Sequence, residues 1–302
     1  MENPYWRKIK LISNKKQMII GLQKLLYRSI PNYPLLFTQF WYYRTFNNKL
    51  NIKTPVSFNE KLQWLKLFGG YERYSNLADK FKVKNYVKIR IGNKYLNNEF
   101  FVVKELESID FSTLPESFVV KPNHLSEYVH ICRDKTNLDV GRLMQTIKYW
   151  RSLDYYFIWF ESVYKNIEPL VLFEEFLSDG YKTLRDYKLF CFNGHVKYIQ
   201  VDIDRFENHT RNMYSRNWEI QNFSYEHPRS NLILSPPGKL DEMISVAEEL
   251  SKGFPFLRVD LYHVKERVVF GELTFFPEAG LGRLFPSSWD LELGSMLDLS
   301  LV

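Results

Sequence analysis

Leu257-Arg-Val-Asp-Leu-Tyr-His-Val264 and Val268-Val-Phe-Gly-Glu-Leu-Thr-Phe275 are the stretches of sequence that decide the predicted fold. Apolar and polar residues alternate in both, as in β-strands with one buried face. The alternation divides the first stretch into an apolar face with Leu257, Val259 and Leu261 and a polar face with Arg258, Asp260 and Tyr262.

The two stretches predict a hairpin that brings two carboxylates together. If Lys265–Arg267 is a three-residue loop, Val264 pairs with Val268, Asp260 faces Glu272, and Arg258 faces Thr274. Like charges directly opposed on antiparallel strands are destabilising, and a divalent cation held by oxygen ligands would compensate them. A loop of another length, or two solvated carboxylates on an open sheet face, is the alternative.

Length, composition and charge limit the kinds of protein that this chain can be. The chain has 302 residues, enough for one domain with subdomains or for two domains. An aromatic content of 17% argues against disorder. The net charge of +6 suits an anionic partner without choosing one. Two cysteines without metal-ligand spacing, and no signal-peptide pattern, predict a reduced, cytoplasmic protein.

The first 50 residues mix basic residues with apolar clusters. They predict two or three amphipathic helices interrupted near Pro31 and Pro34. Such a composition favours packing against the rest of the protein, and docking onto a membrane surface is the alternative. Peripheral association with the inner face of a membrane therefore stays open.

The remaining chain alternates helical and strand patterns. Ser57 and Glu60 have capping-box spacing before a helix that ends at Gly69-Gly70. Further helices are expected at 77–90, within 138–166 and at 240–252. Strands are expected at 100–103, 118–121, 170–173, 186–192 and 195–202, the last two joined by the hairpin signal Asn193-Gly194. Residues 203–239 are expected to form a long polar loop. The pattern predicts an α+β protein with antiparallel sheets.

Several separated motifs resemble one family. They are Ala78-Asp-Lys80, Phe118-Val-Val-Lys121, Lys121-Pro-Asn-His124, Glu174-Glu-Phe-Leu177, Asp186-Tyr-Lys-Leu-Phe-Cys-Phe-Asn-Gly194, Arg258-Val-Asp260 and Glu272-Leu-Thr274. Their order is similar to that of ATP-grasp enzymes, and more closely to the TupA-like branch, which is associated with capsular and other cell-surface polysaccharides. The resemblance spans roughly residues 50–290.

The resemblance implies a fold and a domain division. It implies two α+β subdomains that grip ATP between antiparallel sheets, preceded by a helical N-terminal extension. The expected boundaries are a helical region at 1–76, an N-terminal ATP-grasp subdomain at 77–177, and a C-terminal subdomain with the metal site at 178–302.

The resemblance also implies a nucleotide site. Lys80 and Lys121 match the family's two phosphate-binding lysines. In the adenine hinge, the backbone of Glu175 and Leu177 and the side chain of Glu174 would bind the base. The other expected nucleotide contacts are His124, Ser126, Asp186, in the place of a ribose-binding acid, and Lys188. His124 has a second interpretation as a buried histidine with no ligand.

The metal site follows from the same comparison, whereas an acceptor site is inferred from the residue types of region 203–216. Asp260 and Glu272 match the ligands of Mg²⁺, with Thr274 where the family usually has Asn, and Arg258 would stabilise the transferring phosphoryl group. Arg205, His209 and Arg211, with Arg216 nearby, suggest a site for an acidic sugar, with His209 as a general base. An exposed basic loop without a ligand is the alternative.

Two departures from the family pattern bear on activity. The loop Leu125-Ser-Glu-Tyr128 lacks the glycines that let backbone N–H groups approach phosphate. Pro277-Glu-Ala-Gly280 has a glutamate where related chains more often carry a small residue.

The expected function is an ATP- and Mg²⁺-dependent carboxylate–amine ligase. It would form an acyl phosphate and then an amide on a uronic acid or related polysaccharide precursor. A glycosyltransferase or sugar kinase is one alternative, suggested by Asp202-Ile-Asp204. A non-catalytic ATP- or glycan-binding protein is another. Nucleic-acid binding is not expected, because the basic residues are dispersed.

Overall fold

The computed structural model describes residues 4–105, 109–180, 184–203 and 209–302, with the exposure of side chains given from Lys15 onward. Its α-helices are α1 (Pro4–Ser29), α2 (Tyr33–Phe46), α3 (Phe58–Phe68), α4 (Ser75–Ala78), α5 (Val83–Ile91), α6 (Val140–Arg151), α7 (Tyr156–Trp159), α8 (Leu240–Ser251) and α9 (Ser288–Met296). Its strands are β1 (Glu99–Val103), β2 (Phe118–Pro122), β3 (His130–Cys132), β4 (Val171–Glu175), β5 (Asp186–Phe192), β6 (His195–Ile203), β7 (Thr210–Ser215), β8 (Ser224–Tyr225), β9 (Phe256–Val264), β10 (Arg267–Thr274) and β11 (Leu284–Phe285).

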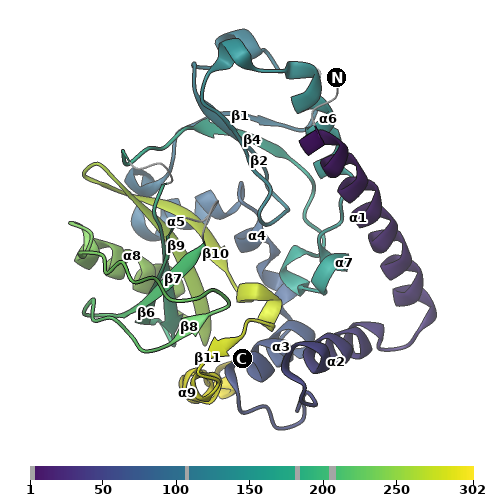
Figure 1. The fold of residues 1–302 in the computed structure, drawn as a ribbon, viewed down its shortest axis with the longest axis vertical. Helices are drawn as coiled ribbons and strands as arrows, with labels where there is room; N and C mark the ends of the chain where they lie inside the picture. Colours follow the sequence, from purple (N-terminus) through teal and green to yellow (C-terminus); the bar gives the residue numbers. More distant parts are fainter. Residues whose placement is uncertain (1–3, 106–108, 181–183, 204–208) are drawn as a thin grey trace.

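The strands form antiparallel sheets, so the predicted α+β class is confirmed. A four-stranded sheet has the order β1-β4-β2-β3, a five-stranded sheet has the order β10-β9-β5-β6-β7, and β11 pairs with β8. In Figure 1 the four-stranded sheet lies in the upper part of the molecule and the five-stranded sheet at the lower left, with α4 near the centre and α7 to the right of it. The helix α1 runs along one margin.

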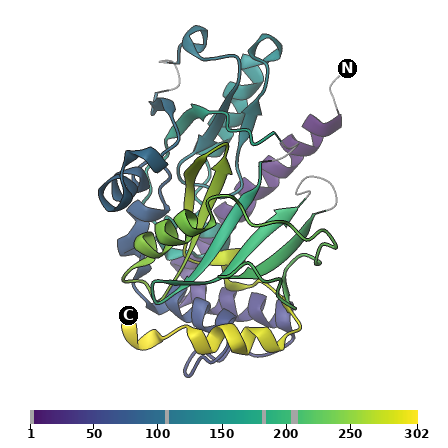
Figure 2. The same cartoon turned by 90° about the vertical axis from the view of Figure 1, so that its left-hand side faces the viewer.

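Two apolar cores support the two larger sheets. The core of the five-stranded sheet also contains residues of α3 and α5, such as Leu62 and Val87. The core of the four-stranded sheet includes residues of α6 and Ile20 of α1. Figure 2 shows α9 crossing below the sheets, where it packs on α3. The two sheets divide the chain between Glu175 and Asp186, near the predicted boundary at residue 177; the predicted boundaries themselves stay a prediction.

The hairpin of β9 and β10 has a shorter loop than predicted. Arg267 pairs with Val264, so the loop is the two-residue Lys265-Glu266. Lys265 adopts a φ of 55°, as the first position of the two-residue turns that match strand twist requires. The predicted three-residue loop and the pair of Val264 with Val268 are therefore wrong.

A β-bulge restores the predicted pairs further along the hairpin. The register shifts between Phe270 and Glu272, so that Asp260 lies opposite Glu272 as predicted. Gly271 occupies the bulge. A Cβ there would lie 2.9 Å from the backbone oxygen of Asp260 and 3.1 Å from the ring of Tyr262. Only glycine leaves room for this approach, so Gly271 fixes the register in which Glu272 and Thr274 of β10 pair with β9.

Two local predictions are confirmed in detail. Ser57 caps α3 in a reciprocal capping box with Glu60. Asn193 and Gly194, with φ of 52° and 79°, form the tight turn between β5 and β6. In the N-terminal region the chain breaks between α1 and α2, around Pro31, as expected.

The predicted helix at 77–90 is present from Val83, but its predicted start is wrong because Asp79 interrupts it. Asp79 has an extended ψ of 112°, and its Oδ1 accepts hydrogen bonds from the backbone N–H groups of Phe81 and Lys82. These are helix-capping contacts, so α4 ends before Asp79 and α5 begins at Val83. Lys80 therefore lies in a non-helical connection.

Two further predictions need correction. The helical stretch at 138–166 is broken after Arg151, and the short α7 follows. The expected loop at 203–239 contains β7 and β8. The alternation in β7 was hidden because the polar residues Arg211 and Asn212 are both buried and hydrogen-bonded. Among the described helices, none combines the length and hydropathy needed to cross a bilayer.

We predict that Gly271→Ala destabilises the protein by about 1–3 kcal/mol, because its Cβ would press on the backbone of β9. Thermal or urea unfolding measures the effect. Gly141→Ala in α6 is the matched control, since the nearest atom to its Cβ is Asp139 Oδ1 at 3.5 Å. Equal stabilities of the two variants would contradict this role of the bulge.

Candidate active site

One face of the five-stranded sheet carries most of the predicted site residues. The register aligns Glu272, Asp260, Lys188 and Gln200 across four strands, and side chains two residues away point to the same face. From β10 to β7 this face presents Thr274 and Glu272, Arg258 and Asp260, Asp186 and Lys188, Gln200 and Asp202, and then Arg211. The other face packs into the apolar core through residues such as Val259 and Leu189.

Asp260 is the most enclosed carboxylate of this face, with 2% of its surface exposed. Arg258 holds it with two parallel bonds, from Nε to Oδ1 at 2.7 Å and from Nη2 to Oδ2 at 2.8 Å. Lys188 Nζ adds a third contact with Oδ2 at 2.8 Å and also pairs with Asp186. Burial would lower the pKa of Lys188, but the two carboxylates outweigh it and raise the pKa.

Glu272 lies beside this cluster and is more open, with 30% of its side chain exposed. Arg258 Nη2 donates to Thr274 Oγ1 at 3.0 Å, and that hydroxyl donates to Glu272 Oε1 at 3.2 Å. Burial would raise the pKa of Glu272, yet Lys80, Arg258 and other cations lower it to about 2. Glu272 therefore stays ionised at neutral pH.

Lys80 links the two larger sheets. Its backbone N–H donates to the carbonyl of Asn123, at the end of β2, at 3.1 Å. Its Nζ donates to the carbonyl of Leu125 and lies 3.8 Å from Glu272 Oε2 on β10. Burial lowers the pKa of Lys80 and nearby Lys121 lowers it further, while Glu272 acts in the opposite direction.

Glu174 is held by two lysines. Its Oε2 lies 2.7 Å from Lys121 Nζ and its Oε1 lies 2.7 Å from Lys84 Nζ. Burial alone would raise the pKa of Glu174, but the two ammonium groups lower it to about 2. Lys84, which also pairs with Glu99, was missed in the sequence. No local pattern points to Lys84, because its partner Glu174 lies ninety residues away in the sequence.

The expected adenine hinge follows β4. The backbone N–H of Glu175 donates to the backbone carbonyl of Asn98, and the backbone carbonyl of Glu175 accepts from Asn97 Nδ2 at 3.0 Å. The carbonyl has a second lone pair for a base, whereas the N–H is already used. Leu177 is half-buried two residues beyond the strand. The hinge role of these residues stays a prediction.

The loop after Lys121 differs from the expected nucleotide contacts in one place. His124 is buried and bonded to the carbonyl of Trp150 through Nε2, and burial lowers its pKa to about 4. This favours the interpretation as a packed histidine. Ser126 is half-buried and bonds with Tyr155. Glu127 has a φ of 68°, the left-handed region in which a glycine would be unstrained.

The predicted acceptor residues lie in different surroundings. Arg205 lies outside the described residues, as does Asp204 of the motif that suggested a transferase. Arg211 is buried and bonds with Asp202 at 2.6 Å and with the carbonyl of Tyr225 at 2.7 Å. Arg216 is 47% exposed and pairs with Glu248 instead.

His209 lies beside the pair of Arg211 and Asp202. Its Nε2 is 3.4 Å from Asp202 Oδ1, and its ring centre is 3.6 Å from that of His227. Burial lowers the pKa of His209, while Asp202 acts in the opposite direction. The buried Asp202, engaged by Arg211 and His209, resembles an internal ion pair more than an open metal ligand.

The turn Pro277–Gly280 follows β10 and lies beside the site. In the sequence, this turn is marked only by its departure from the family pattern. Glu278 and Ala279 have φ of 51° and 56°, and Arg211 Nη1 lies 3.4 Å from Glu278 Oε1. Lys66 of α3 donates to the carbonyl of Ala279. Glu161 is also buried here, and burial raises its pKa to about 8 despite the neighbouring Lys66. Glu278 has a left-handed φ, which glycine would adopt without strain.

The residues around Glu272 have the donor chemistry for Mg²⁺. Asp260, Glu272 and Thr274 offer hard oxygen atoms within one hairpin, and Mg²⁺ commonly takes one or two carboxylates plus phosphate oxygens. No group of three His, Cys, Asp or Glu side chains with metal-site geometry occurs among the described residues. Mg²⁺ at this place would therefore take part of its coordination from a phosphate or water.

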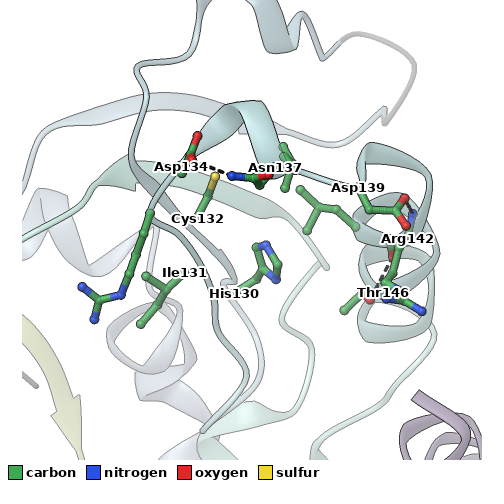
Figure 3. A pocket seen from close by; sticks show the side chains of 11 residues that line it. His130, Ile131, Cys132, Asp134, Asn137, Asp139, Arg142 and Thr146 are labelled. Atoms are coloured by element: carbon green, nitrogen blue, oxygen red, sulfur yellow. Dashed lines mark hydrogen bonds between the residues drawn. The ribbon is translucent and has the colours of Figure 1, made fainter. Parts of the chain in front are cut away.

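A cavity of about 260 Å³ lies elsewhere, between β3 and α6. Figure 3 shows its lining, with Cys132, Asp134 and Asn137 on one side and Arg142 and Thr146 on the other. None of the predicted site residues lines it. We therefore place the candidate active site on the charged sheet face and not in this cavity.

We predict that Glu174 stabilises the fold in a pH-dependent way. Its folded pKa of about 2 lies below the ordinary value of 4.5, so its contribution is present above pH 4.5 and is lost as pH falls toward 2. In Glu174→Gln the unfolding free energy should fall less steeply across this range, as measured by denaturant unfolding at each pH. Glu266→Gln, on the exposed hairpin loop, is the control; a wild-type slope in Glu174→Gln would contradict the prediction.

We further predict that Glu127→Gly is more stable than Glu127→Ala by about 1 kcal/mol, because only glycine adopts a left-handed φ without a Cβ clash. Both substitutions remove the same charge, so the melting temperatures isolate the backbone effect. Equal melting temperatures would show that this loop is not strained.

Comparisons with known proteins identify one matching family. A family model described as TupA-like ATPgrasp matches residues 60–298. A comparison with curated proteins finds no match. Among solved structures, D-alanine–D-alanine ligase from Bacillus anthracis is 16% identical with a TM-score of 0.41, and 67% of this chain covers 58% of that one.

Two other solved structures are similarly distant. D-alanine–D-alanine ligase from Helicobacter pylori is 15% identical with a TM-score of 0.42, over 80% of this chain and 67% of that one. The ATP-grasp ligase PsnB complexed with minimal precursor is 12% identical with a TM-score of 0.40, over 72% and 60%. Since the family model covers most of its length, the chain belongs to the TupA-like ATP-grasp family.

Proposed function

We propose that the protein is an ATP- and Mg²⁺-dependent carboxylate–amine ligase. The proposed product is an amide on a uronic acid or related precursor of a capsular or other cell-surface polysaccharide. Membership of the TupA-like ATP-grasp family supports ATP as the nucleotide substrate. The observation that carries the proposal is Lys80, which joins the loop after β2 to Glu272 on β10 and so gathers cations and carboxylates between the two sheets.

The proposed reaction has two steps, phosphorylation of the carboxylate and attack of the amine on the resulting acyl phosphate. A carboxylate oxygen of the acceptor attacks the γ-phosphorus of ATP, the bond to the ADP oxygen breaks, and an acyl phosphate forms. The amine nitrogen then attacks the carbonyl carbon, phosphate leaves with the bonding electrons, and the nitrogen loses a proton.

The residues of this chain have separate roles in that proposal. Lys80, Lys121 and Arg258 supply positive charge where phosphate charge develops. Their carboxylate partners hold them in position through the contacts described above. Mg²⁺ held by Asp260 and Glu272, beside Thr274, would neutralise further phosphate charge.

The acceptor side lies toward β6 and β7. Arg211 is already paired with Asp202, so its proposed role is to orient His209 and the turn at Glu278. His209 then faces the acceptor as the proposed base for the attacking amine. Arg205, which lies outside the described residues, is carried over from the sequence as a further member of the proposed acidic-sugar site.

Glu272→Ala tests this function. With ATP, Mg²⁺, a uronate and an amine together, we expect the rate of ADP release to fall by roughly 100-fold or more, the loss seen when one preorganised charge-stabilising group is removed. Glu266→Ala on the hairpin loop is the matched control and should keep the wild-type rate. Unchanged release in Glu272→Ala would refute the metal assignment.

Ligand choice separates the proposal from a sugar-nucleotide transferase. ATP with Mg²⁺ should raise the melting temperature, and UDP-sugars should leave it unchanged. The opposite result would favour the transferase.

A non-catalytic nucleotide-binding role is the second candidate. The observation that favours it is Glu127, which places a negative charge and a strained backbone in the loop expected to cover phosphates. Stabilisation by ATP without ADP release, across a broad set of carboxylates and amines, would support this role over the ligase.

A further inference from the structure

The positive charge of this protein is concentrated in its first two helices. Residues 1–59 contain ten Lys and Arg residues and one acidic residue, Glu2. Their formal charge is +9, whereas the whole chain carries +6. The remainder, which contains the candidate active site, is therefore slightly acidic.

The helix α1 packs on the protein with one face only. Ile20 is buried, Tyr27 stacks against the ring of Phe160, and Lys24 pairs with Asp154. The outward face carries Met18, Leu22 and Leu25 at the spacing i, i+4, i+7, and these side chains are between 55% and 70% exposed.

The helix α2 repeats this pattern. Thr38 and Tyr42 are buried, while Leu36, Phe40 and Tyr43 follow the same spacing on the outside, between 49% and 57% exposed. In Figure 1 both helices lie at the margin of the molecule, with α1 along one side and α2 at its lower end. Six large apolar side chains on two adjacent helices exceed the scattered exposure that is normal for a soluble surface.

The exposed basic residues frame these apolar stripes. Lys15, Arg28, Arg44 and Lys49 are all exposed on or next to the two helices. Apolar and aromatic side chains with Lys and Arg beside them, on helices too polar to span a bilayer, are typical of helices that lie in a membrane interface.

We propose that α1 and α2 form a docking surface for an anionic lipid membrane. The charge selects this occupant over a second copy of the chain, because two copies of a surface with exposed Lys15, Arg28, Arg44 and Lys49 would repel each other. The apolar stripes enter the headgroup boundary and the basic residues contact anionic headgroups. Lys16, on the packed side of α1, bonds with Tyr128 at 2.7 Å, so the surface lies next to the loop that follows Lys121.

Vesicle co-sedimentation of the full chain tests the proposal. We expect binding to vesicles of phosphatidylcholine mixed with phosphatidylglycerol, weaker binding at high salt, and little binding to phosphatidylcholine alone. Replacing Lys15, Arg28, Arg44 and Lys49 by Gln should weaken binding roughly tenfold or more. Replacing Met18, Leu22 and Leu25 by Gln should weaken it in all anionic vesicles.

A charge-matched variant serves as the control. Lys88, Lys148, Lys197 and Arg267 are exposed elsewhere, and their replacement by Gln removes the same net charge. This variant should bind as the wild type does. Equal loss in both charge variants would overturn the proposal, because bulk charge would then explain the binding.

The wild-type protein alone also decides the question if a variant fails to fold, as judged by circular dichroism. Failure to bind anionic vesicles overturns the proposal. Concentration-dependent dimers that disappear in the Met18, Leu22 and Leu25 variant, without vesicle binding, would instead assign the surface to a second copy. ATP binding is independent of either result, so the proposed enzyme function stands or falls separately.

Discussion

The bidentate contact between Arg258 and Asp260 is the constraint on which the large sheet depends. A carboxylate that is 2% exposed would cost several kcal/mol if it were unpaired. Arg258 on the same strand and Lys188 on the next strand satisfy it. The register of β9 with β5 is therefore tied to charge balance as well as to apolar packing, because a slip of one residue would turn Asp260 into the core.

The same contact extends to the other side of β9. Arg258 reaches Thr274, and Thr274 reaches Glu272, so β10 must also hold its register. Gly271 makes this possible by forming a bulge next to the backbone of Asp260. The candidate metal ligands are thus positioned by a chain of hydrogen bonds and by one glycine.

Charge also joins the two larger sheets. Lys80 reaches from the loop after β2 to Glu272, and Lys121 and Lys84 meet at Glu174. Each cation has a carboxylate partner, which lets several charged groups share a partly buried space. The excess of positive charge lies instead on α1 and α2, away from this balanced interior. The two regions therefore differ in charge balance: the interior is paired and the two helices carry an excess of positive charge.

Local sequence determined the alternation of β9 and β10, the capping box of α3 and the turn at Asn193-Gly194, because those features depend on neighbours within a few residues. The ATP-grasp resemblance came from motifs of the same local kind. Tertiary structure decided the rest. The bulge at Gly271 depends on the close approach of the backbone of Asp260 on the opposite strand. Glu174 is paired with Lys84, which lies ninety residues away in the sequence. The strand at Arg211 was hidden because its polar residues are satisfied by groups distant in sequence, and no local pattern records such a partner.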